Sequence, residues 1–342
     1  MKTAYISDLA PDQNITGFFL VCEKEIRTGN SGKPYLRLSL GDRSGVIEAR
    51  MWENFEREAA GIARDDFAKV QGRVDLFNGR KQLRVDRIRR AEPNEIEISD
   101  YFPHTKENID VLETRLREYA EMVRNPWLRQ LVTGVLDDPA IMPRLRRAPA
   151  ARSMHHAFIG GLLEHIVSLC GLCTAVGGRY PEVDVDWLLT AAVLHDIGKL
   201  EELTYERAFS YSDEGQLLGH IIIGLEWVTK RMDAIEGFPD EMKTLVKHLI
   251  ISHHGKYEFG SPKLPAFREA VLFNFLDDMD AKMAGMRTSL EDAGGEGGWT
   301  AYNSSLQRKL LRVEQFLNPQ PAEQPTAPTQ AQLPLGGNGK ES

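Results

Sequence analysis

An adjacent pair, His195-Asp196, stands inside an apolar stretch of this chain and carries the side chains that metal chemistry needs. A neutral imidazole binds one divalent ion, and a carboxylate can bind two at once. Other metal-binding side chains lie before and after the pair: His165, His220, His253, His254 and Asp277. Two ions held together generate a hydroxide near neutral pH and stabilise the oxygen that leaves a phosphodiester. The set therefore indicates a metal-dependent phosphoesterase with Asp196 as a catalytic residue.

The donor atoms also indicate which ions bind. Imidazole nitrogens favour Mn, Fe, Co, Ni or Zn over Mg. We expect two divalent ions, with Mn as the first choice and Co, Fe, Ni or Zn as alternatives.

These side chains fall on a series of predicted helices. Apolar residues recur at helical intervals from about residue 105, and Pro126 marks the start of a second helix. Further helices are predicted at 154–175, 184–200, 216–231, 241–253 and 265–286. The pattern predicts an all-α region in which separate helices bring the metal ligands together.

The order of the ligands resembles that of the HD-domain phosphohydrolases, whose pattern is His, then His-Asp, then Asp. That pattern is carried here by His165, by His195-Asp196 and by Asp277. Asp278 and Asp280 compete with Asp277 for the last place, and Asp277 matches the pattern best. The resemblance implies a first ion bound by His165, His195, Asp196 and Asp277. It implies a second ion bound by Asp196, His220, His253 and His254.

The same resemblance implies roles around the ligands. Lys199 is expected to face a substrate phosphate as a second catalytic residue. Asp280 is expected to orient a ligand from outside the coordination shell. His155 and His156, which precede an apolar helix, are expected to reach the mouth of the site.

Residues 14–92 show a different pattern, that of short strands. Apolar and polar side chains alternate, and the runs are separated by turn signals such as Asn78-Gly79. Five strands with a helix between the third and fourth predict an all-β OB-fold barrel, a fold that commonly binds oligonucleotides. The stretch from Gly32 to Trp52 resembles the second and third strands of OB modules in tRNA-binding proteins and some nucleases.

Four side chains of the barrel are candidates for contact with nucleic acid: Lys33, Tyr35, Arg37 and Trp52. Aromatic rings stack on bases and cations bind phosphates, although either aromatic ring could instead belong to the core. The net charge of the chain is −8, yet residues 73–90 hold seven basic side chains against two acidic ones. Such a basic stripe fits a surface that follows phosphates, and it equally fits solvated strand edges.

A closer resemblance is to the YhaM-type 3′-5′ exoribonucleases, which join an N-terminal OB-fold to an HD domain. The segments that carry it are 155–165, 193–199, 215–220, 252–256, 260–262 and 276–283. The likeness runs from about residue 10 to residue 315 and departs at Asn274-Phe275, where His-rich residues are expected. It implies trimming of single-stranded RNA from the 3′ end to nucleoside 5′-monophosphates, with single-stranded DNA left open as a substrate.

Other functions compete with this one. An HD enzyme that acts on small nucleotides or cyclic dinucleotides would use the same metals, with the barrel serving in assembly. A nucleic-acid-binding protein without catalysis would not need the complete ligand set, and a scaffold role has no support in the residues. No Gly-rich phosphate loop is present, which argues against an ATP-driven mechanism.

Composition sets the remaining expectations. The hydrophobic content of 42% and the charged content of 27% are typical of a globular protein, and no apolar run is long enough to span a membrane. Three cysteines and no signal-peptide pattern favour a reduced, cytoplasmic protein. We expect an OB-fold domain at 1–95, a helical linker at 96–150, an HD domain at 151–317 and a disordered tail at 318–342. The oligomeric state stays open, a homo-oligomer included.

Overall fold

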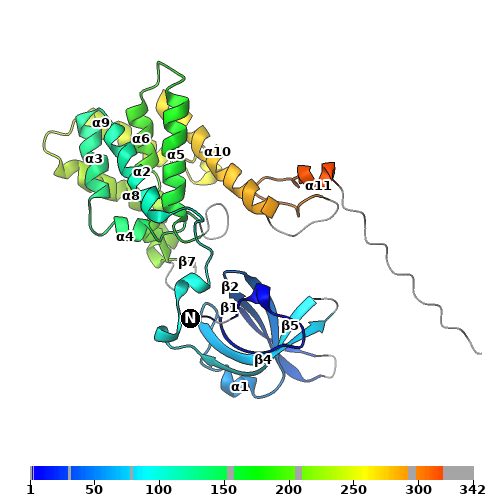
Figure 1. Ribbon diagram of the computed structural model, residues 1–342. Coiled ribbons are helices and arrows are strands. Elements are labelled where there is room, and N and C mark those ends of the chain that lie inside the picture. The colour runs from blue at the N-terminus through cyan, green and yellow to red at the C-terminus, as the bar shows by residue number, and fades with distance from the viewer. Residues whose placement is uncertain are drawn as a thin grey trace, which may run out of the picture. The chain divides into compact units, whose positions relative to one another are not determined.

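The computed structural model describes residue 2 and residues 4–29, 32–77, 80–151, 158–204, 210–291 and 298–318. The chain divides into two compact units, Met1–Gly285 and Met286–Ser342. A closed five-stranded barrel comes first and a series of helices follows, so the predicted fold class is confirmed (Figure 1). No helix in the described part of the chain is both long and apolar enough to cross a membrane.

The barrel is built from strands β1 (Asn14–Thr28), β2 (Pro34–Asp42), β3 (Gly45–Met51), β4 (Phe67–Phe77) and β5 (Arg80–Arg90), with helix α1 (Phe55–Glu58) between β3 and β4. The strand order is β1-β2-β3-β5-β4, and β4 pairs back with β1 to close the sheet. Only β3 and β5 run parallel among these pairs. Alternate side chains such as Leu36, Leu38 and Leu40 point inward and are fully buried, as the period of a strand requires.

The helical elements are α2 (Ile109–Met122), α3 (Pro126–Leu136), α4 (Met142–Leu145), α5 (Gly161–Gly177), α6 (Val185–Leu194), α7 (Lys199–Glu202), α8 (Asp213–Ala234), α9 (Asp240–Ser252), α10 (Arg268–Glu291) and α11 (Val313–Leu317). Short 3-10 turns occur at Ile6–Asp8, Pro93–Glu95, Ile98–Asp100 and Tyr257–Phe259, and a two-stranded ribbon joins β6 (Leu203–Thr204) to β7 (Ser210–Tyr211). The ribbon was not predicted, because its strands are too short to show a period.

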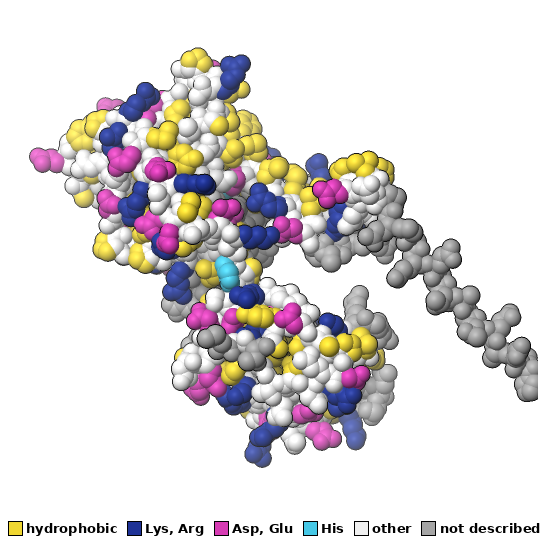
Figure 2. Space-filling view, viewed as in Figure 1, with side chains coloured by type: hydrophobic (Ala, Val, Ile, Leu, Met, Phe, Trp, Pro, Cys, Tyr) yellow, Lys and Arg dark blue, Asp and Glu magenta, His cyan; other side chains and the backbone are white. Residues whose placement is uncertain are grey.

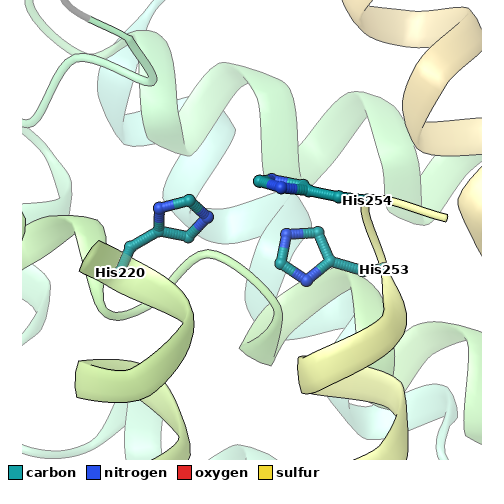
Figure 3. Close-up of side chains that lie close together, drawn as sticks. All are labelled: His220, His253 and His254. Atoms are coloured by element: carbon teal, nitrogen blue, oxygen red, sulfur yellow. The ribbon is translucent and has the colours of Figure 1, made fainter. Parts of the chain in front are cut away.

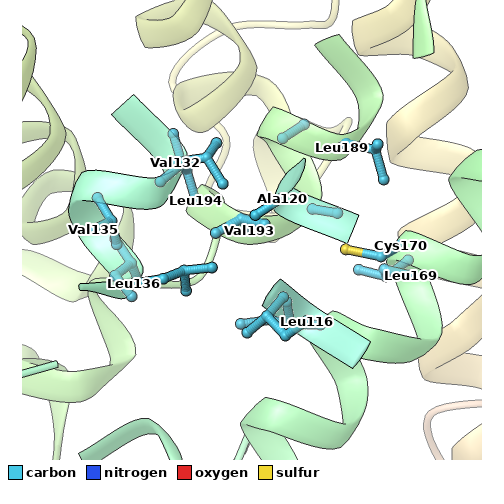
Figure 4. Packing of buried hydrophobic residues seen from close by; sticks show 14 of the residues in the cluster. Leu116, Ala120, Val132, Val135, Leu136, Leu169, Cys170, Leu189, Val193 and Leu194 are labelled. Carbon is cyan, nitrogen blue, oxygen red and sulfur yellow. The ribbon is translucent and has the colours of Figure 1, made fainter. Parts of the chain in front are cut away.

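Helix α6 lies at the centre of the helical core. From Leu188 to Leu194 every side chain is buried, and a helix that is buried on all sides must be apolar all round. Figure 4 shows its residues Leu189, Val193 and Leu194 among side chains of α2, α3 and α5. This packing holds the end of α6, and therefore the residues that follow it, in a fixed place.

Two predicted helices differ from the structure by more than five residues at one end. The helix predicted at 184–200 ends at Leu194, so His195-Asp196 lies in a turn before α7. The Nδ1 atom of His195 lies 3.1 Å from the carbonyl oxygen of Ala192, the acceptor that a continuing helix would offer to Asp196. The helix predicted at 154–175 begins at Gly161; residues 152–157 lie outside the described residues.

In the second unit, α11 and two isolated bridges, Trp299–Leu311 and Asn303–Arg308, are described. The predicted tail at 318–342 lies outside the described residues apart from Asn318.

Candidate metal centre

The predicted ligands come from five different places in the helical region. His165 lies on α5, Asp277 on α10 and His220 on α8. His195 and Asp196 follow α6, and His253 and His254 follow the last residue of α9. Residues from distant parts of the sequence therefore meet because the helices around α6 converge at one end.

The first group consists of His165, His195 and Asp277, whose ligand atoms all lie within 4.8 Å of one another. The Asp277 Oδ1 atom is 3.3 Å from Nε2 of His165 and 3.9 Å from Nε2 of His195. Both histidines are about 1% exposed. A carboxylate and two imidazoles at these separations fit one divalent ion.

The second group consists of His220, His253 and His254, again within 4.8 Å of one another. Figure 3 shows the three rings turned toward a common point, from α8 on one side and from the end of α9 on the other. The ring centroids of His253 and His254 are 4.3 Å apart. Neighbouring histidines are thus both directed into the site, which the sequence alone left uncertain.

Asp196 stands between the two groups. Its Oδ2 atom is 3.2 Å from Nε2 of His195, in the first group. Its Oδ1 atom is 3.4 Å from Nε2 of His220 and 3.7 Å from Nε2 of His253, in the second. Each carboxylate oxygen faces a different group, which is the arrangement that a bridging ligand needs.

All five histidine rings are oriented by an acceptor at Nδ1. The acceptors are Asp280 for His165 at 2.8 Å, the Ala192 carbonyl for His195 at 3.1 Å, Glu202 for His220 at 3.0 Å, the Ile250 carbonyl for His253 at 2.7 Å and the Phe259 carbonyl for His254 at 2.7 Å. A neutral ring that donates from Nδ1 keeps the lone pair of Nε2 for a metal. The tautomers are assigned from these contacts.

Four buried atoms at the centre have no hydrogen-bond partner among the described residues: Nε2 of His195, His220 and His253, and Oδ1 of Asp196. A buried polar atom left unpaired costs about 1–3 kcal/mol. Divalent cations would satisfy all four atoms at once. The donor set of imidazoles and carboxylates therefore fits divalent metal ions.

The carboxylates make the site negative, and a metal ion would displace the proton that His165 otherwise carries. Burial disfavours a charged His165, but its contacts with Asp277 and Asp280 prevail and raise its pKa to about 9. Burial would raise the pKa of Asp196, yet His195 and Lys199 hold it well below its ordinary value. Burial likewise opposes the charge of Asp277, but the neighbouring histidines lower its pKa. The carboxylates thus stay negative and attract positive charge.

Lys199 lies at the first residue of α7 and is buried. Its Nζ atom is 2.6 Å from Oδ2 of Asp196. Burial lowers the pKa of Lys199, but the Asp196 carboxylate outweighs this effect and raises it, so the ammonium stays charged. The predicted contact with a substrate phosphate stays a prediction.

Several residues around the ligands were missed or were only partly foreseen. Glu202 accepts from both the backbone N–H and Nδ1 of His220, and nothing in the sequence links the two residues because they lie on separate helices. Asn274, noted as a departure from the family pattern, donates from Nδ2 to the His253 carbonyl at 2.7 Å. His155 and His156 lie outside the described residues.

On the barrel, the four predicted contact residues differ in how they are presented. Tyr35 is 8% exposed and stacks beneath Trp52, with ring centroids 4.5 Å apart. Trp52 itself is 45% exposed, and Lys33 is exposed. Trp52 is therefore the more accessible of the two rings, and the buried Tyr35 stacks against it.

Carboxylates neutralise much of the predicted basic surface. Arg37 lies within 4.0 Å of Glu23, Glu25 and Glu48. Within the stripe at 73–90, Arg73, Arg87, Arg89 and Arg90 have acidic partners, whereas Lys81 and Arg84 have none among the described residues. Figure 2 likewise shows basic and acidic side chains interspersed on the visible face. The basic surface therefore offers only a few cations without acidic partners to the phosphates of a nucleic acid.

Two domain families match the chain. The HD domain matches residues 162–282, and the OB-fold nucleic acid binding domain matches residues 21–91. HD domains depend on metal ions, and the two groups described above could hold them. A curated relative, the 3′-5′ exoribonuclease YhaM of Bacillus velezensis, is 34% identical over 280 residues, which are 82% of this chain and 88% of the relative.

Solved structures match the barrel. The second OB-fold domain of replication protein A from Methanococcus maripaludis is 24% identical, with 26% of this chain and 94% of that chain covered and a TM-score of 0.22. The single-stranded DNA binding protein of Thermus aquaticus is 16% identical, with 25% and 42% covered and a TM-score of 0.22. Likeness at this level says nothing about a ligand.

Proposed function

This chain belongs to the family of the 3′-5′ exoribonuclease YhaM, and from that premise we propose that it hydrolyses single-stranded RNA from the 3′ end. The reaction is hydrolysis of phosphodiester bonds, and the proposed products are nucleoside 5′-monophosphates. Single-stranded DNA is a second substrate to test. We also propose a cytoplasmic location, with which the free thiols of all three cysteines agree.

The observation that carries the proposal is the position of Asp196 between two histidine groups with inward-facing Nε2 atoms. We propose two divalent ions, with Mn²⁺ as the first choice because imidazole ligands predominate. One would be held by His165, His195, Asp196 and Asp277, and the other by Asp196, His220, His253 and His254. When bound, such ions supply positive charge to the phosphodiester and lower the pKa of water.

The remaining side chains prepare the site. Asp280 and Glu202 hold the rings of His165 and His220 at Nδ1, so the ligands need no rearrangement. Ser168 donates to the second oxygen of Asp280 at 2.5 Å and fixes that carboxylate in turn. Lys199 keeps a buried positive charge beside Asp196, from where it would stabilise the negative charge that develops on phosphate.

The barrel would hold the strand upstream of the 3′ end. Trp52 is the proposed stacking surface, with Tyr35 behind it, and Lys33 and Arg37 would face phosphates. Arg37 would have to exchange its acidic partners for phosphate. We therefore expect it to contribute less to the affinity for RNA than Trp52 does.

The test uses the full-length protein with Mn²⁺ and a 5′-labelled single-stranded RNA. We expect a ladder that shortens from the 3′ end and that disappears with EDTA or in an Asp196→Asn variant. RNA that stays intact with wild-type protein would overturn the proposal. Nucleotides and cyclic dinucleotides, assayed with the same protein, then decide for or against the small-substrate alternative.

A further inference from the structure

Helix α10 has an exposed apolar stripe on the side that faces away from the core. Its members recur every four residues: Val271, Phe275, Met279 and Met283, with exposed fractions of 39%, 64%, 41% and 55%. The opposite side of the same helix is buried through Phe273, Leu276 and Ala284. Single exposed apolar residues are common, but four in one row along a helix mark an interaction surface.

The chemistry of the stripe restricts its partner. Lys282, the basic residue nearest its centre, forms an i,i+4 ion pair with Asp278. Arg268, at the start of α10, donates to the carbonyl of Glu182. Arg287, one turn beyond Met283 in the same row, is exposed and has no acidic partner among the described residues. One free cation is fewer than a nucleic acid or an anionic membrane would require. Its partner is therefore another apolar protein surface.

The C-terminal segment of the same chain does not suit this role. Residues 319–342 contain only two large apolar side chains, Leu333 and Leu335, amid prolines, glutamines and glycines. Two leucines cannot cover four side chains spread over three helical turns.

A second copy of α10 is complementary to the first when the two run antiparallel. A two-fold axis beside residues 279–280 places Met279 against its own copy and Phe275 near Met283 of the other copy. Asp278 and Lys282 are symmetric about residue 280, so each acid then lies near a base of the other helix. An isologous contact requires this self-complementarity of shape and charge.

We propose that residues 271–283 of α10 form an antiparallel contact between two copies of this chain. The stripe is small beside the roughly 800 Å² per partner that a specific interface usually buries. The dimer is therefore weak and dependent on concentration. Since Asp277 and Asp280 lie on the same helix, the contact also braces the element that carries one proposed ligand and its orienting partner.

Sedimentation equilibrium of the full-length protein tests the contact. Wild-type protein shows an average mass that rises toward twice the monomer mass as concentration increases to about 100 µM. Phe275→Glu and Met279→Glu remain monomeric, whereas Ile26→Glu, at a barrel position that is 65% exposed, associates like wild type. Far-UV circular dichroism and melting curves establish that the variants are folded. A monomeric wild type, or folded α10 variants that still associate, would overturn the proposal.

Cysteine cross-linking tests the direction of the helices. Met279→Cys lies at the proposed axis and forms a disulfide-linked dimer under mild oxidation, while Val271→Cys, far from the axis, does not. The native Cys170 and Cys173 are buried, and the partly exposed Cys22 is replaced by serine in both variants so that it does not interfere. Cross-linking of both variants would indicate a parallel pair and would contradict the proposed arrangement.

Discussion

Each histidine of the candidate centre is held at one ring nitrogen and is open at the other. Two of the five are held by carboxylates, His165 by Asp280 and His220 by Glu202. A carboxylate partner makes the imidazole a stronger ligand than a carbonyl partner does. These two residues therefore influence the affinity of each proposed ion without touching it.

Replacing Glu202 tests this influence. Glu202→Gln leaves an amide that accepts less strongly from His220 and that carries no negative charge. We expect the affinity for Mn²⁺ to fall by about 10- to 100-fold, measured by calorimetric titration of metal-free protein. Glu201→Gln is the matched control, because Glu201 pairs with Arg144 and not with a histidine. Equal affinities for both variants would show that Glu202 has only a structural role.

The sequence predicts the ligands but not the residues that hold them. His195-Asp196 and Asp277 were recognisable because their order along the chain follows a family pattern. Glu202 was not, because its contact with His220 depends on how α7 and α8 meet. The stacking of Tyr35 under Trp52 could not be predicted either, because each aromatic ring could lie in the core or at the surface.

At the scale of elements, the site depends on a close approach of α7 and α8. A Cβ added at Gly198 would lie 2.1 Å from the carbonyl oxygen of His220 and 2.6 Å from the backbone nitrogen of Gly224. Such contacts involve backbone atoms on both sides, so no side chain can move to relieve them. Gly198 thus permits α8 to present His220 to Asp196.

Gly198→Ala should therefore disturb both stability and the site. We expect the free energy of unfolding to fall by about 1–3 kcal/mol, as in other overpacked cores, together with weaker Mn²⁺ binding. Urea unfolding and titration measure the two effects. Gly134→Ala is the control, because Gly134 lies on α3 with open space around it and alanine favours a helix. Loss of stability in the control but not in Gly198→Ala would contradict this account.

Elements with a clear local pattern were predicted closely. The five strands follow from alternation and turn residues, and their predicted order of strands and helix is that of the barrel. The end of α6 was predicted wrongly because its apolar pattern continues through Ile197 and Leu200. The helix ends where Nδ1 of His195 lies 3.1 Å from the Ala192 carbonyl oxygen, a contact that the apolar pattern does not reveal.

At the scale of the whole molecule, removing the metal ions should weaken the fold. Ions that bind only the folded state stabilise it by about 2.7 kcal/mol when present at 100 times their dissociation constant. We expect the melting temperature to fall after dialysis against EDTA and to recover with Mn²⁺. An Asp196→Asn variant should respond less. A melting temperature that ignores EDTA would speak against a site filled by divalent ions.

We expect the barrel to contribute to binding of the RNA strand and the helical region to carry out its cleavage. In an Asp196→Asn background, Trp52→Ala should weaken binding of single-stranded RNA by roughly 5- to 150-fold, since stacking on one base contributes about 1–3 kcal/mol. Fluorescence anisotropy measures the affinity. Trp299→Ala is a matched control because Trp299 is also 45% exposed. Equal losses for both variants would remove the barrel from the proposed binding surface.

The exposed apolar stripe on α10 is a feature of the folded molecule that could not be predicted from the sequence. Apolar residues occur on several sides of this helix, so their spacing alone does not say which side is buried. Only the packing of Phe273 and Leu276 into the core leaves Phe275 and Met279 outside.

The two histidine groups differ in their exposure to solvent. The two proposed metal ions should therefore stay bound for different lengths of time. His165 and His195 are almost completely enclosed, whereas His254 and His220 are only partly buried. An ion in the enclosed group would exchange slowly, and one in the other group would exchange quickly. A chelator would then strip the protein in two phases. The concentration of free metal ions would then control the activity of the enzyme through the site whose ion exchanges quickly. The ion in the enclosed group would stay bound.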